Sequence, residues 1–124
     1  MVSFTGFARA AGVEGAVVAL VLEHYRGVTL ASMEEIVRDA HLRFEVTRCH
    51  VVHRYGRIIP GEAIVFVAAA ARHRRAAFEA ADYIMDRLKT EAVFWKREEG
   101  DFGTAWIEPS DEDAADVGRW LIED

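Results

Sequence analysis

The stretch AFEAADYIMDRLKTEAVFWKRE, from Ala77 to Glu98, decides the fold, because it has the pattern of an amphipathic helix that leads into an aromatic strand. At about 100° per residue, one side of the helix carries apolar side chains and the opposite side carries polar ones. The apolar set is Ala77, Ala81, Ile84, Met85 and Leu88, and the polar set is Arg75, Glu79, Asp82, Asp86 and Thr90. We expect this helix to run from about Arg72 to about Thr90.

Lys89 lies at the boundary between these two faces, beside Phe78 and Met85. A lysine that only makes the surface soluble has little reason to occupy this position. One interpretation is a lysine that packs its aliphatic stem and keeps its ammonium group in water. The other interpretation is a functional lysine, and the spacing alone leaves both open.

On either side of this helix, the residue pattern predicts one α+β domain over residues 1–124. Runs rich in β-branched and aromatic residues predict strands, and a second apolar stripe at helical spacing predicts another helix. The expected strands are residues 2–9, 16–25, 46–56, 62–71, 93–98 and 104–109, and the expected helices are residues 29–44 and a short C-terminal helix capped by Ser110 and extending to residue 124. The run 62–71 is apolar on both faces, so we expect it to be a central strand. Ser32 and Glu35 form a capping-box pattern near the start of the first helix.

Length and composition limit the classes of protein that this chain can represent. A chain of 124 residues is long enough to bury its own core. The net charge of -6 argues against sequence-independent binding to nucleic acid. No apolar run approaches the roughly 20 residues needed to span a bilayer, and the N-terminus lacks the pattern of a signal peptide. A single cysteine, Cys49, cannot form an internal disulfide, which favours a reducing, cytoplasmic location.

The start of the long helix carries an unusual run of basic residues, RHRR at positions 72–75. Basic residues at a helix N-terminus oppose the helix dipole unless an anion joins them. One interpretation is an exposed basic first turn. The other is an anion site formed by His73, Arg74 and the helix end, and the sequence leaves both open.

The remaining reactive side chains favour structure over chemistry. We expect Cys49 to be a buried structural cysteine, because it alternates with Val51 on one face of its strand. His50 and His53 are three residues apart on that strand, so they face opposite ways and form a poor metal pair. The sequence therefore predicts no metal site, and any chemistry would depend on lysine, arginine and histidine.

Five motifs in order give the chain a family resemblance. They are FTGFAR (4–9), LEHY (22–25), HRYGRIIPGEAIVFVA (53–68), HRRAAFEAADYIMDRLK (73–89) and FWKRE (94–98). From about Val2 to about Trp106, the chain resembles the large, catalytic subunit of molybdopterin synthase. The resemblance implies an α/β-hammerhead fold of the α+β class, with a mostly antiparallel sheet, two main helices and a short C-terminal helix.

The resemblance also implies an activity and partners. Members of that family are cytoplasmic sulfurtransferases of molybdenum cofactor biosynthesis. They form a central homodimer, and each end binds a small ubiquitin-like sulfur-carrier subunit to give a heterotetramer. Sulfur moves from the thiocarboxylated C-terminal Gly-Gly of that subunit to cyclic pyranopterin monophosphate, which builds the dithiolene of molybdopterin. The implied substrate is thus a pterin phosphate, with no resident cofactor or metal.

Matching positions assign candidate site residues. The resemblance implies that Lys89 and Lys96 are the two catalytic lysines. It implies that the substrate-binding residues are Arg9, His73, Arg74, Phe4 and Met85. Because Lys89 would lie beside Phe78 and Met85, we expect it to be partly desolvated, which would favour its neutral form.

Two departures from the family pattern keep other functions open. The family normally has about thirty residues, forming a strand and a helix, before the FTG strand, and we expect both elements to be missing here. The segment Ile107–Ser110 also lacks an arginine that the family often carries. One alternative is a non-catalytic dimeric scaffold that binds the ubiquitin-like partner. Another is a small anion-binding module that uses His73 and Arg74 without any partner.

Overall fold

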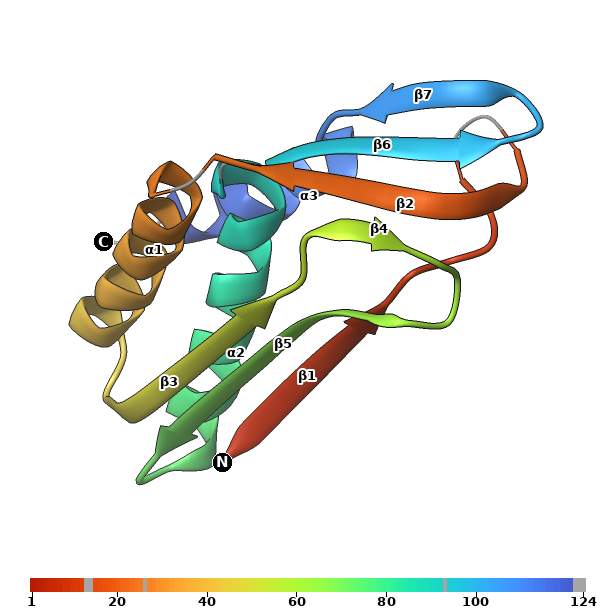
Figure 1. Cartoon of the computed structure of the whole chain (residues 1–124). Coiled ribbons are helices and arrows are strands. Elements are labelled where there is room, and N and C mark those ends of the chain that lie inside the picture. Colours follow the sequence, from red (N-terminus) through yellow and green to blue (C-terminus); the bar gives the residue numbers. More distant parts are fainter. Residues whose placement is uncertain (13–14, 26, 93, 122–124) are drawn as a thin grey trace.

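The computed structural model describes residues 1–12, 15–25, 27–92 and 94–121 and has an α+β fold (Figure 1). Its elements are β1 (Val2–Phe7), β2 (Val17–His24), α1 (Val28–Arg43), β3 (Val46–His53), β4 (Gly56–Ile58), β5 (Ala63–Ala71), α2 (Arg74–Glu91), β6 (Phe94–Gly100), β7 (Gly103–Ile107), α3 (Asp111–Gly118) and a 3-10 turn (Arg119–Leu121). The predicted fold class is confirmed. Val93 and residues 122–124, which were expected to belong to a strand and to the last helix, lie outside the described residues.

The strands form two antiparallel sheets. One has the order β1-β5-β3 and the other has the order β4-β2-β6-β7. As predicted from its apolar character on both faces, β5 is the central strand of the first sheet. The helices α1 and α2 pack on one side of this sheet, and Figure 1 shows α2 running from the N-terminal end of β1 up to the second sheet.

One of the crossings between the two sheets follows β3. The sequence predicted one strand over residues 46–56, but in the structure the strand ends at His53 and the chain crosses to the other sheet. There β4 begins at Gly56, whose φ of 90° is a backbone conformation that glycine adopts without steric cost. The predicted strand boundary was wrong because alternation of residue types does not reveal where a chain changes sheets.

The main core lies between the helices and the three-stranded sheet. It is formed by buried residues of α1, β5 and α2, namely Ile36, Ala40, Val65, Val67, Ala69, Ala80, Ala81, Tyr83, Ile84 and Leu88. The predicted apolar face of α2 is confirmed, since Ala77, Ala81, Ile84 and Leu88 are buried and Met85 is half-buried. A smaller core of Ala8, Leu22 and Ile58 fills the space where the two sheets approach each other.

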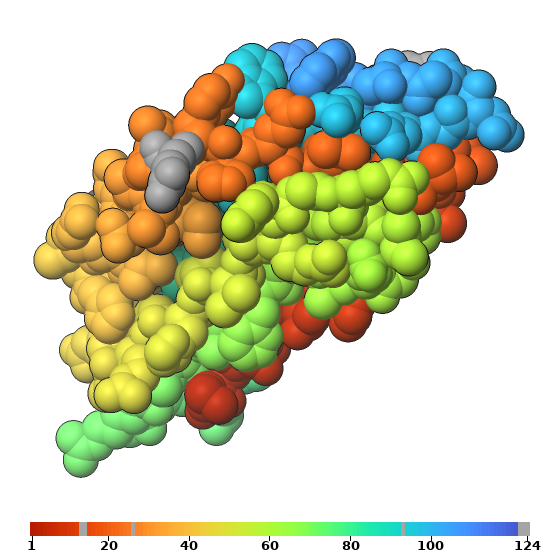
Figure 2. Space-filling model, viewed as in Figure 1, coloured from red at the N-terminus to blue at the C-terminus, as the bar shows by residue number. Residues whose placement is uncertain are grey.

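In the part of the chain that the structure describes, no helix lies over the other side of the three-stranded sheet. Figure 2 shows this side in the view of Figure 1, with β3, β4 and β5 forming a continuous yellow and green surface. The apolar side chains of Val52 and Phe66, which are directly paired across β3 and β5, are exposed there. The three-stranded sheet is therefore buried on one face only.

The predicted capping box of the first helix is wrong. Helix α1 begins at Val28, after Gly27, and Thr29 Oγ1 accepts a hydrogen bond of 2.8 Å from the backbone N–H of Tyr25. Ser32 therefore lies inside the helix, where its hydroxyl donates to the Thr29 carbonyl at 2.7 Å. A serine in a helix interior bonds back to the preceding turn and caps nothing.

The C-terminal segment, residues 110–121, covers part of the side of α2 that the sequence assigned to solvent. Ser110 caps α3 as predicted, and the Ser110 hydroxyl accepts from Asp113 N–H at 3.0 Å. Asp86 was expected on the polar face, yet it is only 7% exposed. Its carboxylate accepts hydrogen bonds from Arg119 at 2.6 Å and from the Trp120 indole N–H at 2.8 Å. The helical pattern could not reveal this burial, because the covering residues come from far along the chain.

We predict that Ile84→Ala lowers the free energy of unfolding by about 2–5 kcal/mol, because it leaves a cavity in the main core. Ile84 is fully buried between α2 and the three-stranded sheet. Urea unfolding followed by circular dichroism measures the change. The matched control on the same helix is Glu79→Ala, an exposed position where the change should stay within about 0.5 kcal/mol. Equal losses in the two variants would contradict this packing.

Candidate active site

Lys89 and Lys96 lie close together where α2 ends and β6 begins. Lys89 is in the last turn of α2, and Lys96 is the third residue of β6, where it pairs with Leu22 of β2. The positive charge of Lys89 lowers the pKa of Lys96, so the two ammonium groups lie within electrostatic reach. The predicted lysine pair is thus brought together by the tight connection between these two elements.

Lys89 is held by a carboxylate that the sequence did not single out. Its Nζ lies 3.1 Å from Asp113 Oδ1, and the Lys89 side chain is 51% exposed while that of Asp113 is 18% exposed. Asp113 is the third residue of α3, placed by the capping box with Ser110. About half of the Lys89 side chain is covered, in line with the expected partial desolvation, but its ammonium group is paired with a carboxylate at the edge of α3. The Ser110-x-x-Asp113 pattern was the available signal, but it indicated only a helix start.

Lys96 is the desolvated lysine of the pair. Burial lowers the pKa of Lys96, the nearby carboxylate of Asp113 raises it, and the charge of Lys89 lowers it further. The net pKa lies below the ordinary value for lysine. A lysine with a lowered pKa exchanges its proton more readily near neutral pH, as acid–base catalysis requires. The chemical property that the sequence suggested for Lys89 thus belongs to Lys96.

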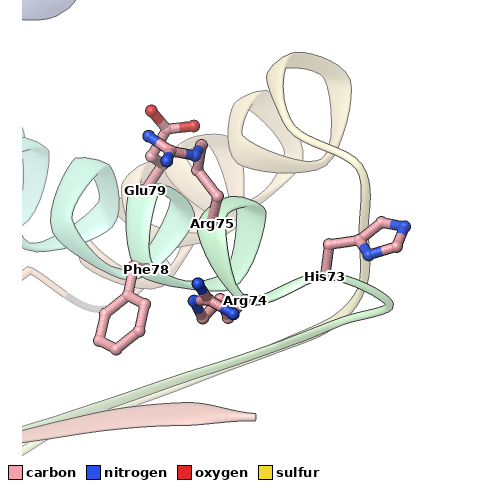
Figure 3. Close-up of a pocket in the computed structure, with 5 residues that line it drawn as sticks. All are labelled: His73, Arg74, Arg75, Phe78 and Glu79. Atoms are coloured by element: carbon pink, nitrogen blue, oxygen red, sulfur yellow. The ribbon is translucent and has the colours of Figure 1, made fainter.

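His73 and Arg74 lie at the other end of α2, beside an open hollow of about 430 Å³. His73 is the N-cap residue and Arg74 is the first residue of the helix. Figure 3 shows the side chains that line the hollow, which are His73, Arg74, Arg75, Phe78 and Glu79. Three of the five can carry positive charge, and the free N–H groups of the first helical turn lie beside them. This end of α2 has the chemistry of an anion site, although Glu79 lies at its rim.

The other predicted substrate residues lie along and beyond β1 and on α2. Phe4 pairs with the buried Val67, so it faces the helices, and it is 48% exposed. Met85 lies one helical turn before Lys89 and packs against the main core. Arg9 is exposed, two residues after the end of β1. The structure brings Met85 near the lysines, and it places His73 and Arg74 at the opposite end of α2.

The remaining sequence expectations concern Cys49, metals and membranes. Cys49 is half-buried against the main core, and burial raises the pKa of its thiol, as expected of a structural cysteine. Within residues 1–12, 15–25, 27–92 and 94–121, no three His, Cys, Asp or Glu side chains are grouped to hold a metal ion. In that same part of the chain, no helix combines the length and the apolar character needed to cross a membrane.

Comparison with known proteins identifies relatives of this chain. The family model described as MoaE protein matches residues 1–91. The molybdopterin synthase catalytic subunit of Caulobacter vibrioides is 55% identical over 118 residues, covering 95% of this chain and 77% of the relative. The protein of the same name from Escherichia coli is 45% identical over 120 residues, covering 97% of this chain and 80% of the relative.

Solved structures agree with these sequence relatives. The MoaE protein of Burkholderia ambifaria has a TM-score of 0.80 at 41% identity, over 98% of this chain and 80% of that one. Molybdopterin synthase from Staphylococcus aureus has a TM-score of 0.80 at 26% identity, over 86% of this chain and 77% of that one.

The fold and the site define an α+β protein with a pair of lysines where its long helix leads into β6, one half-buried and one held by a carboxylate. The chain belongs to the MoaE family, the catalytic subunits of molybdopterin synthase, which are sulfurtransferases of molybdenum cofactor biosynthesis.

The ion pair on Lys89 predicts how stability depends on pH. Burial alone would raise the pKa of Asp113, but hydrogen bonds from Lys89 and Ser110 hold it below its ordinary value. A carboxyl group with a lowered folded-state pKa stabilises the fold above its unfolded pKa of about 3.9. That stability is lost as the pH falls through the folded-state pKa.

We therefore expect Asp113→Asn to be less stable than the wild-type protein at pH 7, with the gap closing as the pH falls below about 4. Asparagine keeps the size of the side chain and can still accept from a helix N-terminus. Urea unfolding of both proteins from pH 7 to pH 3 measures the gap. A difference that stays constant over this range would show that the charge of Asp113 contributes nothing to stability.

Proposed function

We propose that the lysine pair is the place where sulfur passes from the thiocarboxylated Gly-Gly tail of a small ubiquitin-like subunit to cyclic pyranopterin monophosphate, giving the dithiolene of molybdopterin. The observation that carries this proposal is the carboxylate of Asp113 on Lys89, at 3.1 Å. A thiocarboxylate is an anion of similar shape. Lys89 already holds such a group from its own chain, so it is suited to hold the end of an incoming tail.

The two lysines have different proposed roles. Lys89, exposed and paired, binds and orients the anionic tail. Lys96, whose pKa is lowered by burial, moves protons as the sulfur bonds to a carbon of the pterin and water adds to the carbonyl carbon of the tail, so that the carbon–sulfur bond breaks and the tail leaves as a carboxylate. Both the donor and the acceptor are anions, and the chain has a net charge of -6, so binding depends on a local concentration of cations.

We assign the pterin phosphate to a pocket shared by two subunits. His73 and Lys89 are 16 residues apart on one unbroken helix. At about 1.5 Å per residue this is about 24 Å, whereas a pterin monophosphate is only on the order of 10 Å long. One copy of α2 therefore cannot bring both ends to one substrate. In the proposed homodimer, His73 and Arg74 of one subunit lie near Lys89 and Lys96 of the other, with Arg9, Phe4 and Met85 along the walls.

The proposed assembly is a heterotetramer of two such chains and two ubiquitin-like subunits, acting in the cytoplasm. The name of the relatives, catalytic subunit, supports a second type of subunit in the complex. Because the sulfur arrives on the partner, the proposed reaction needs no resident metal or cofactor. The half-buried Cys49, with its raised pKa, is then not a sulfur carrier.

We predict that Lys96→Ala lowers single-turnover dithiolene formation by about 10²–10⁴-fold, the usual contribution of an acid–base group. Lys89→Ala should lose turnover mainly through weaker binding of the partner's tail. The measurement combines the protein with thiocarboxylated partner and cyclic pyranopterin monophosphate at several partner concentrations. A partner that lacks its two terminal glycines is the negative control. Near-normal rates in a folded variant that carries both Lys89→Ala and Lys96→Ala would refute the lysine site and favour a non-catalytic scaffold.

The shared pocket makes a second prediction, which complementation tests. At a low partner concentration, where weak binding of the tail limits Lys89→Ala, we expect this variant and a His73→Ala, Arg74→Ala double variant each to be inactive alone. After subunit exchange, a mixed dimer carries one pocket with all the lesions and one with none, so activity should return to up to half of the wild-type level per dimer. Exchange is verified by native mass spectrometry. Confirmed exchange without recovered activity would assign His73 and Arg74 to a separate anion site.

A further inference from the structure

His53 occupies the point where the chain leaves the three-stranded sheet for the four-stranded one. It is the last residue of β3 and pairs with Val65 of β5. Val65 belongs to the main core under the helices, and directly paired residues share a face of the sheet. The His53 side chain therefore faces the same side as α2, whereas His50 of the same strand is exposed on the opposite face.

Two contacts fix the imidazole ring of His53. The ring stacks on Phe94, with ring centroids 4.2 Å apart and an angle of 27° between the planes. Its Nδ1 lies 2.8 Å from the carbonyl oxygen of Arg54. A carbonyl only accepts hydrogen bonds, so Nδ1 carries the proton in this contact. In the neutral ring, the other nitrogen, Nε2, then has a free lone pair and is an acceptor.

The stacking contact places the imidazole ring on the side of β6 from which the half-buried Lys96 extends. Phe94 and Lys96 are two residues apart on β6, so their side chains project from the same face. Burial lowers the pKa of His53, the bond to the Arg54 carbonyl raises it, and the positive charge of Lys96 lowers it. The net shift is downward, so the ring is neutral at physiological pH, and the two residues influence each other electrostatically.

The other polar groups around this ring are accounted for. On α2 and α3, the charged groups of the lysine site are Lys89 and Asp113, which are paired with each other. Arg54 is paired with Glu62. On the β2 side, His24 is in ring contact with Tyr55. The charge that acts on His53 is therefore that of Lys96.

We propose that His53 is a positioning residue of the sulfur-transfer site, whose neutral Nε2 accepts a hydrogen bond from Lys96 and orients that lysine toward Lys89 and the bound tail. This role rests on the proposed function of the lysine pair. The His53 ring is held in place by Phe94 and by the carbonyl of Arg54, where the chain passes from one sheet to the other. His53 can therefore orient the flexible side chain of Lys96, which β6 alone leaves free to rotate. Protonation of Nε2 removes the acceptor and places a second cation beside Lys96.

The first test compares variants that separate the acceptor from the ring. His53→Phe keeps the stacking on Phe94 but has no acceptor, and it should lower the single-turnover rate by roughly 10- to 100-fold, the cost of misplacing a catalytic group by about 1 Å. His53→Gln places a non-titrating acceptor near the position of Nε2 and should restore most of that loss at neutral pH. His50→Phe, on the opposite face, is the matched control and should keep the wild-type rate. Equal rates for His53→Phe and wild type would overturn the proposal.

The pH profile adds a readout that a purely structural role would not change. In the wild type, the rate should fall as the pH drops through the pKa of His53, below about 6.5, because the imidazolium cannot accept a hydrogen bond. This acid limb should be absent in His53→Gln, which cannot titrate. An unchanged acid limb in that variant would show that another group is responsible and would overturn the proposal.

A second test needs no turnover and so distinguishes failure of this inference from failure of the proposed function. Proton NMR of the imidazole C–H signals follows the titration of His53 in the protein alone. Removing the positive charge with Lys96→Met should raise the pKa of His53 toward about 6.5 and leave the His50 signal unchanged. An unaltered titration of His53 would show that the two side chains are not coupled, whatever the activity of the complex.

Discussion

Burial of one face of α2 against the central strand β5 fixes the positions of the proposed site residues at both ends of this helix. Ile84 and Leu88 on the helix and Val65 and Val67 on the strand form a close-packed contact that leaves the helix no freedom to slide or rotate. The two ends of α2 are therefore fixed relative to both sheets. The N-terminal end carries the basic hollow, and the C-terminal end delivers Lys89 to the start of β6. Because the helix is rigid, its length sets the distance between the two cationic groups.

Within the lysine site, burial and charge divide the chemistry between two residues of the same type. Lys96 extends from a strand that is covered on one side by the second core, and desolvation dominates its titration. Lys89 extends from the end of a helix where a third helix supplies a carboxylate. A low-dielectric environment favours the neutral amine of Lys96, whereas the carboxylate beside Lys89 shows a position where an anion is held. Two lysines seven positions apart in sequence can thus hold an anion and move a proton at the same time.

The sequence predicted what depends on local periodicity, and it failed where distant segments meet. The apolar stripe from Ala77 to Leu88 and the central character of residues 62–71 followed from helical and strand periods, and both are confirmed. Asp86 has the pattern of a solvent-facing residue, but Trp120 and Arg119 bury it. The helical wheel placed Lys89 among apolar side chains of α2, but in the structure the carboxylate of Asp113, from α3, lies beside it. The lysine pair itself came from family resemblance, because no spacing rule places a helix residue next to a strand residue across a turn.

The C-terminal segment holds its carboxylate on Lys89 without burying any residue of α3. Its anchors are the bonds of Arg119 and Trp120 to Asp86 and the edge-on contacts of the Trp120 ring with Phe44 and Tyr83. A segment with so little buried area unfolds locally at a much lower free-energy cost than the whole domain. Each such opening releases Lys89 from its internal counter-ion while the rest of the domain stays folded. Amide hydrogen exchange in α3 would then report how often the site is open to an external anion, on a timescale independent of global unfolding.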